Sequence, residues 1–169
     1  VGMDGEPLPP EHGFPARLVV PGLYGYVSAT KWLSEIRVTT WDEEGFWIPR
    51  GWSRLGPIKI ASRIDVPHSG AELAAGTVAV AGVAWAPQRG ISKVEVRIDE
   101  GDWREARLGP VPSDDTWVQW VLEWPATAGD HRITVRATDG DGEIQTAEKA
   151  PPAPDGATGH HSVQVSVAP

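Results

Sequence analysis

The chain has 169 residues, a formal net charge of −8, nine tryptophans and no cysteine. Nucleic acids are bound by basic surfaces, so the acidic balance argues against nucleic-acid binding. The lack of cysteine excludes disulfides, thiolate metal sites and cysteine nucleophiles. The high tryptophan content favours packed β structure or an interface.

The first distinctive segment, residues 5–33, is dominated by proline and glycine. Proline lacks the N–H donor of a β ladder and fixes φ, so neither a continuous helix nor a central strand is expected there. The segment nevertheless carries a short apolar run, Leu18-Val19-Val20, several aromatic residues and few charges, unlike a disordered linker. We expect an irregular, packed loop that needs a partner surface.

Three motifs follow one another in this segment. They are His-Gly-Phe-Pro-Ala-Arg at residues 12–17, Val-Val-Pro-Gly at 19–22 and Ser-Ala-Thr-Lys-Trp-Leu at 28–33. Together they resemble the closing segment of the molybdenum-cofactor domain in the sulfite oxidase family. The resemblance implies that His12, Arg17 and Lys31 contact the molybdopterin and its phosphate, with Thr30 beside them. Cations and backbone N–H groups suit a phosphate. The alternative, which the residues alone favour and the resemblance does not, is that His12 and Arg17 merely satisfy carbonyls in an ordered loop.

In that family a single cysteine thiolate binds molybdenum upstream of this segment, and the present chain has no cysteine. We therefore expect a C-terminal fragment of a molybdenum-dependent oxidoreductase, in which residues 1–50 are the tail of the molybdopterin-binding domain. The fragment alone is expected to have no catalytic residues, no bound metal or cofactor and no activity. Its implied partners are the missing N-terminal cofactor domain and an electron-transfer protein. The resemblance is compatible with an extracytoplasmic or membrane-anchored full-length protein.

After this segment, Glu35–Thr39 is predicted as a short strand, and an aromatic connector occupies residues 41–57. Its Trp41, Trp47 and Trp52 are expected to pack between the two parts of the chain. Short segments separated by turn residues then predict eight strands: Ile58–Asp65, Thr77–Trp85, Lys93–Asp99, Asp102–Leu108, Thr116–Trp124, His131–Thr138, Glu143–Ala147 and His160–Val167.

Apolar and polar residues alternate along these strands with a period of two, and no convincing helix appears. Strands of this number and length predict an immunoglobulin-like antiparallel β-sandwich, mainly β in class, preceded by the irregular Pro/Gly-rich segment. Trp120 and Trp124 share a strand face with Val118 and are expected in the core. Trp117 alternates with them and is expected to be exposed or to lie at an interface.

Residues 55–169 also resemble the immunoglobulin-like dimerisation domain of the same family. The matching residues are Gly-Val-Ala-Trp at 82–85, the hairpin from Val94 to Trp103, and Trp117 with Trp120. The resemblance implies a homodimer formed through this domain. Where the family has an arginine that helps bind the oxyanion substrate, this chain has Ser162, which weakens the case for sulfite as substrate.

Other motifs have simpler explanations. The run from Asp139 to Glu143 could suggest calcium, but it lacks the remaining ligand spacing of an EF-hand, and a turn explains it. His160 and His161 would point to opposite faces of a strand and are not expected to bind metal together. The competing hypothesis is a stand-alone β-sandwich module that binds carbohydrate or protein. Such a module would have no use for the motifs of residues 5–33.

Overall fold

The computed structural model describes all residues from 1 to 169. Its chain forms two compact units. Unit 1 comprises Val1–Ile58 together with Pro151–Ala157, and unit 2 comprises Lys59–Ala150 together with Thr158–Pro169. These units differ from the predicted ranges of 1–50 and 55–169, chiefly because a segment from late in the sequence belongs to unit 1. No helix is long and apolar enough to cross a membrane.

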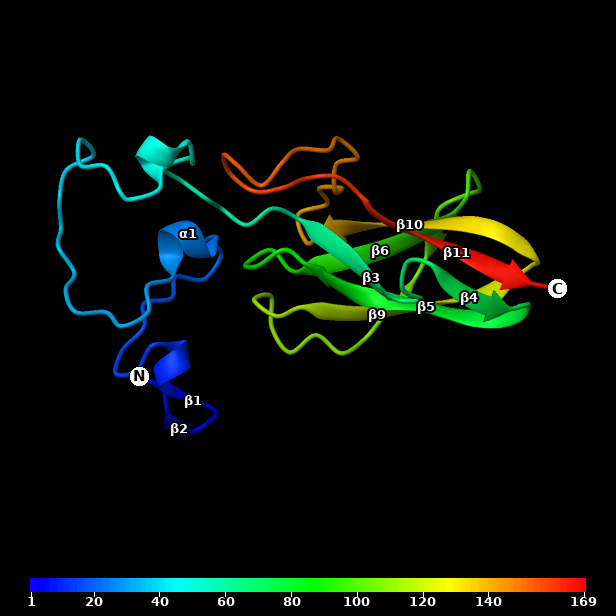
Figure 1. The fold of residues 1–169 in the computed structure, drawn as a ribbon, viewed down its shortest axis with the longest axis horizontal. Coiled ribbons are helices and arrows are strands. Elements are labelled where there is room, and N and C mark those ends of the chain that lie inside the picture. Colours follow the sequence, from blue (N-terminus) through cyan, green and yellow to red (C-terminus); the bar gives the residue numbers. More distant parts are fainter. The chain divides into compact units, whose positions relative to one another are not determined.

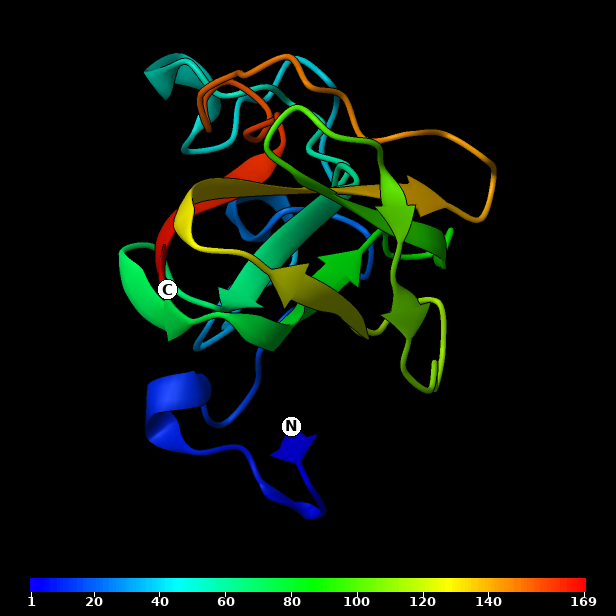
Figure 2. The same cartoon turned by 90° about the vertical axis from the view of Figure 1, so that its right-hand side faces the viewer.

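Unit 2 is a sandwich of two β-sheets (Figure 1). The five-stranded sheet has the order β4-β11-β10-β6-β7, formed by Ala71–Ala74, His161–Ala168, Gly129–Asp139, Ile91–Ile98 and Arg104–Glu105. The four-stranded sheet has the order β3-β5-β9-β8, formed by Ala61–Val66, Gly76–Trp85, Val118–Ala126 and Arg107–Leu108. The yellow β10 and the olive β9 lie in different layers of the sandwich in Figure 2. The predicted fold class is confirmed.

The core lies between the two sheets and is filled by the inward-pointing residues of each strand. Val80, Val94, Val96, Ile133 and Val135 are fully buried. Trp120 and Trp124 are buried as predicted, whereas Trp117 is 55 % exposed. The period-two alternation therefore identified the core face of β9 correctly, because one side of that strand faces the second sheet.

A close approach of β3 to β5 depends on Gly82. An added Cβ at this position would collide with the carbonyl oxygen of Arg63 and with the ring of Trp120. The register of the two strands shifts between Ile64 and Val66, so β3 carries a bulge beside this glycine. Glycine is needed here because the bulge brings the neighbouring backbone into the space of a side chain.

Two predicted strands are wrong. Residues 35–39 form no strand, since Ile36 and Val38 are exposed and have no neighbouring strand with which to pair. Residues 143–147 contribute only an isolated bridge between Ile144 and Thr138. The strand β4 was not predicted; it pairs in parallel with the end of β11.

Unit 1 has little regular structure. Its elements are a two-residue hairpin of β1 (Gly2–Met3) and β2 (Glu6–Pro7), the 3-10 turns η1 (Pro10–His12) and η2 (Ile48–Arg50), and the single-turn helix α1 (Gly25–Ser28). An aromatic cluster links α1 with the residues around η2. In it, the ring of Trp52 lies 4.6 Å from that of Tyr26 and 6.0 Å from that of Trp47.

The segment Pro151–Ala157 of unit 1 is held by hydrogen bonds from residues in or next to this aromatic cluster. Ser53 N donates to Pro154 O at 2.8 Å, and Tyr26 Oη donates to the same oxygen at 3.4 Å. The ring of Tyr24 lies against Gly156, where an added Cβ would collide with it. Residues 151–157 are therefore a structural part of unit 1.

Unit 1 exposes an unusual amount of apolar surface. Most of the exposed large hydrophobic side chains of the chain lie in this unit, among them Val38 at 95 % and Trp41 at 74 % exposure. A cluster of exposed apolar residues commonly marks a surface that contacts another protein or domain. The expectation that residues 5–33 need a partner surface is consistent with this exposure.

Candidate functional site

The two segments that carry the predicted cofactor contacts pair with each other in unit 1. Leu18 and Thr30 exchange both of their backbone hydrogen bonds, at 2.9 and 3.2 Å. Leu33 N donates to Ala16 O at 2.9 Å, one residue out of the register of this bridge, so the two segments stay together beyond it. Motifs that are separated in the sequence therefore lie side by side.

The 3-10 turn η1 positions His12 next to this pairing. Pro10 occupies the first position of the turn, where its missing N–H is not needed. Gly13 ends the turn with a φ of 111°, a left-handed conformation that glycine adopts without strain. An added Cβ at Gly13 would lie 3.0 Å from Lys31 Cα, so glycine also allows the turn to contact Lys31 closely.

Two side chains of the segment 28–33 donate hydrogen bonds to backbone carbonyls of η1. Lys31 Nζ donates to Glu11 O at 2.7 Å, and Trp32 Nε1 donates to Pro10 O at 3.0 Å. An ammonium group has three N–H donors, so Lys31 retains donors for a further acceptor. This contact fixes the position of the lysine without neutralising it.

Arg17 precedes Leu18 and Lys31 follows Thr30, so the bridge between Leu18 and Thr30 places these two cations on facing segments. Opposed residues of an antiparallel pair project to the same side, and two like charges placed there repel each other. Both side chains are exposed, and neither forms an ion pair with a carboxylate. Two uncompensated cations on facing segments are suited to an anion such as a phosphate.

The structure separates Thr30 from this pair of cations. Successive residues of an extended segment point to opposite sides, so Thr30 projects away from Lys31. It lines a pocket of about 420 Å³ together with Tyr26, Phe46, Trp47 and Arg54. Thus Arg17 and Lys31 lie together, His12 lies exposed in the adjoining turn, and Thr30 faces the other way.

These residues fit part of a pterin cofactor, as judged by the chemistry of their donor groups. Arg17 and Lys31 supply cationic donors for a phosphate, and His12 adds an exposed imidazole. Unit 1 has no cysteine, and no group of three or more His, Asp or Glu side chains in the chain could hold a metal ion. The donor set is therefore that of an anion contact and not of a metal ligand sphere.

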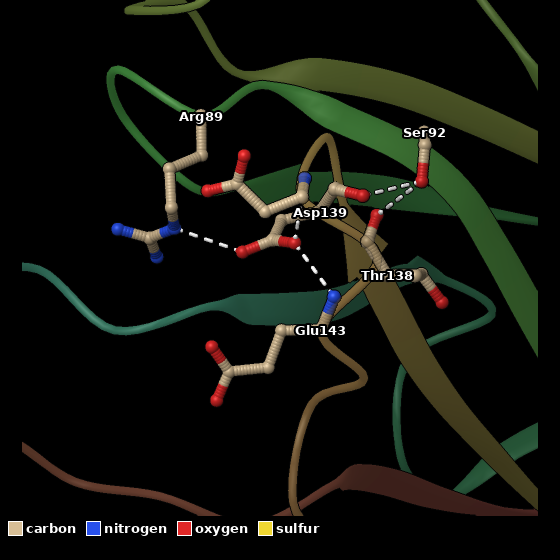
Figure 3. A network of polar contacts seen from close by, with 6 residues as sticks. Arg89, Ser92, Thr138, Asp139 and Glu143 are labelled. Carbon is tan, nitrogen blue, oxygen red and sulfur yellow. Dashed lines mark hydrogen bonds and ion pairs between the residues drawn. The ribbon is translucent and has the colours of Figure 1, made fainter.

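A second polar site lies in unit 2 and is structural. The carboxylate of Asp139, with a fully buried side chain, accepts hydrogen bonds from Arg89 Nε at 2.8 Å, Glu143 N at 2.9 Å and Asp141 N at 3.1 Å (Figure 3). Ser92 Oγ donates to the Asp139 carbonyl at 2.5 Å. The Asp139 carboxylate is fully buried and its donors come from the turn itself and from Arg89, so a turn explains the motif.

An Asp–His pair in unit 2 has the form of a general-base dyad but not its function. His131 Nδ1 lies 2.8 Å from Asp99 Oδ2, and Nε2 lies 2.8 Å from Thr127 O. Both ring nitrogens face acceptors, so the imidazolium form satisfies both contacts and leaves no nitrogen to abstract a proton. The hydrogen bonds to Asp99 and Thr127 raise the pKa of His131 above its ordinary value, although burial opposes this.

We predict a pH-dependent contribution to stability from His131. A raised folded-state pKa stabilises the fold fully below about pH 6.5, and the contribution is lost as the pH rises through the raised value. In thermal melts between about pH 6 and about pH 9, His131→Gln should have a lower Tm than the wild type at the acidic end. The two Tm curves should converge at the alkaline end. A constant difference across the range would contradict the prediction.

The remaining histidines do not form a metal site. His161 Nδ1 accepts a hydrogen bond from Ile64 N at 3.0 Å, and burial together with the charge of Arg63 lowers the pKa of His161. His160 Nε2 instead contacts Gln145 O at 3.0 Å. The next residue of β11, Ser162, is exposed, and it is the position at which the resemblance expects an arginine.

Two family models match the chain in tandem. An oxidoreductase molybdopterin-binding domain matches residues 1–47, and a bacterial Ig domain matches residues 61–135. The first match contains all the paired segments of the candidate site. The second covers most strands of the sandwich.

Curated relatives match both parts together. Mouse mitochondrial sulfite oxidase is 30 % identical over 88 % of this chain and 32 % of its own length, and the human enzyme is 29 % identical over the same shares. An uncharacterized oxidoreductase of Bacillus subtilis, YuiH, is 51 % identical over 31 % of this chain and 26 % of its own length. The chain thus spans about a third of the length of these sulfite oxidases.

A solved structure also matches both parts of the chain. The sulfane dehydrogenase SoxCD from Paracoccus pantotrophus superposes with a TM-score of 0.72 and 26 % identity, over 94 % of this chain and 46 % of that one. The resemblance found in the motifs of residues 12–33 is thereby confirmed. The chain belongs to the sulfite oxidase family of molybdopterin oxidoreductases, whose C-terminal part it matches.

Proposed function

We propose that this chain is the C-terminal part of a sulfite oxidase-type, molybdenum-dependent oxidoreductase. In this proposal unit 1 completes the cofactor domain by contacting the pterin phosphate, and unit 2 is a dimerisation domain. The observation that carries it is the uncompensated pair of Arg17 and Lys31, held on facing segments by the Leu18–Thr30 bridge. When bound, the molybdenum cofactor supplies two-electron oxygen-atom transfer.

The residues of this chain would act by binding and orientation. Arg17 and Lys31 would hold the phosphate through charge-assisted hydrogen bonds, and His12 would contribute a further donor from η1. Thr30, which faces the aromatic pocket, would contribute through its backbone or hydroxyl. Because the chain holds no thiolate, it is expected to have no activity and no stoichiometric molybdenum by itself.

The exposed apolar surface of unit 1 supports the same proposal. Side chains such as Val38, Trp41 and Phe46 are more exposed than a self-contained unit would leave them. The rest of a cofactor domain would cover them. Sequencing the source reading frame upstream of Val1 tests this directly, since a cofactor-binding domain with a single cysteine is expected there, and a start codon at or just before Met3 would overturn it.

The cofactor contacts can be tested in the complete gene product. We expect Arg17→Glu and Lys31→Glu each to lower the molybdenum content by about tenfold or more, because each removes a charge-assisted hydrogen bond and adds a repulsive charge. Molybdenum is measured per mole of folded protein by inductively coupled plasma mass spectrometry. Arg37→Glu is the matched control, since Arg37 is an exposed cation of the same unit whose side chain lies 3.9 Å from Glu43. Equal molybdenum in all three variants would contradict the assignment of Arg17 and Lys31.

A further inference from the structure

We propose that Trp32 is a positioning residue, which uses a strained backbone conformation to hold the ammonium group of Lys31 beside the turn η1, ready for an anion. This inference rests on the phosphate contact of Lys31 in the proposed function and adds what fixes that cation. The first observation concerns the backbone. Trp32 has a φ of 54°, in the left-handed region, and it is the bulkiest of the four non-glycine residues with a positive φ. A bulky residue in this region is a true outlier.

This conformation accompanies one extra residue in the pairing of the two motif segments. Beyond the bridge between these segments, the next backbone hydrogen bond runs from Leu33 N to Ala16 O. One residue, Arg17, separates the two contacts on the first segment, whereas Lys31 and Trp32 separate them on the second. Two residues opposite one is the arrangement of a β-bulge, and a bulge changes the direction of the side chains beside it.

The bulge brings two successive side chains to the same side of their segment. In a regular strand, Lys31 and Trp32 would point to opposite sides. Here Lys31 Nζ donates to Glu11 O at 2.7 Å and Trp32 Nε1 donates to Pro10 O at 3.0 Å. Both side chains therefore reach neighbouring carbonyls of η1. The ammonium nitrogen also lies 5.8 Å from the centre of the indole ring, within the range in which an aromatic face attracts a cation.

The contacts of Trp32 hold it in the strained conformation. Besides the indole contact, Trp32 N donates to Gly13 O at 3.4 Å. A strained residue persists only where its surroundings determine its conformation, and such residues cluster at binding sites. Burial does not explain the strain, because the side chain of Trp32 is 61 % exposed. The orientation of Lys31 and η1 is what this conformation achieves.

A lysine that is already held binds an anion more tightly than a mobile one. An exposed lysine samples many rotamers, and fixing it during binding costs conformational entropy. Lys31 is restrained before the anion arrives, and its ammonium group retains donors beyond the one that Glu11 O accepts. We expect this restraint to raise the affinity for the phosphate by about three- to tenfold, the usual effect of one immobilised side chain.

Two substitutions in the complete gene product test the role of Trp32. Trp32→Phe keeps a ring but removes the indole N–H, and Trp32→Gly keeps the left-handed backbone without strain but removes the whole side chain. Both should speed the release of the cofactor, measured as molybdenum lost during dialysis, by about three- to tenfold. Trp41→Phe is the matched control and should leave the release rate unchanged. Trp41 is also exposed and also lies 5.8 Å from a cation, the guanidinium group of Arg54.

The dependence on Lys31 distinguishes positioning from a general structural role. Trp32→Phe should have no further effect once Lys31→Met has removed the ammonium group, and it should keep its full effect beside Arg17→Met. Equal melting temperatures of the cofactor-free proteins would show that the variants are folded. An equal effect of Trp32→Phe in all three backgrounds, or unchanged release from both Trp32 variants, would overturn the inference. Unchanged release from Lys31→Met and Arg17→Met would instead overturn the proposed function, so the two failures are distinguishable.

Discussion

Replacing Asp139 by asparagine is expected to lower the free energy of unfolding by about 3 kcal/mol, because it removes a charge that is buried among donors. The carboxylate accepts from Arg89 Nε and from two backbone N–H groups, and its side chain has no exposed surface. Asparagine has a similar shape, but its NH₂ group would face one of these donors. In the wild type, the contact between Arg89 and Asp139 connects the turn after β5 with the turn after β10. A donor–donor contact at this place would be repulsive, so both turns should loosen.

Denaturant unfolding at neutral pH measures this loss, and Asp141→Asn is the matched control. Asp141 lies two residues away, is exposed, and contributes only its backbone N–H to the network. Equal effects of the two substitutions would show that the buried carboxylate is unimportant.

The same network predicts a pH dependence. Burial alone would raise the pKa of Asp139, but the hydrogen bond and charge of Arg89 and the backbone amides lower it below its ordinary value of about 3.8. Its contribution to stability is therefore present above that pH and is lost as the pH falls through the lowered value. The difference in stability between the wild type and Asp139→Asn should shrink in strong acid.

Replacing Gln145 by leucine is expected to cost about 2–4 kcal/mol, because several buried polar groups lose their partner at once. Gln145 Oε1 accepts from Ser62 Oγ at 2.6 Å and from Ala137 N at 3.1 Å, and Nε2 donates to Gly159 O at 2.9 Å. The buried amide therefore ties β3 and β10 to the residues that precede β11. Leucine has a similar volume, so the loss reflects unsatisfied hydrogen bonds and not a cavity.

Gln164→Leu provides the comparison for this substitution, since Gln164 is exposed and its replacement should change stability little. A double-mutant cycle with Ser62→Ala sharpens the test. Removing the Ser62 hydroxyl should cost about 1 kcal/mol when Gln145 is present and less when leucine replaces it. Strict additivity of the two substitutions would argue against the shared hydrogen bond.

The sandwich could be predicted from the sequence because its central strands are long and half buried. In β9 the buried Val118, Trp120 and Trp124 alternate with outward residues, so the pattern itself encodes the layer between the sheets. In contrast, β4 has four residues and pairs in parallel with a strand about ninety positions away. No local signal identifies such a strand.

The contacts of the polar side chains could not be predicted from the sequence to the same extent. Gln145 lay in a predicted strand, and its N–H does donate to Ala137 O in β10. Ala137 N, however, donates to the Gln145 side chain, which also accepts from the distant Ser62, so the backbone pairing does not continue. The motifs identified Arg17 and Lys31 by resemblance. Their placement on facing segments, however, depends on a single bridge in an irregular segment, and hydrophobic periodicity carries no information about such a bridge.

The assignment of Pro151–Ala157 to unit 1 limits how this protein can be recombined. The chain passes between the two units three times, after residues 58, 150 and 157. An immunoglobulin-like domain joined to its neighbour by one linker can be exchanged as a cassette, but this one carries a segment that must fit Tyr24, Tyr26 and Ser53 of its own unit 1. Chimeras that exchange only residues 59–169 between homologues should therefore be less stable than those that keep residues 151–157 with their native unit 1. Natural exchange of the sandwich between family members would face the same constraint.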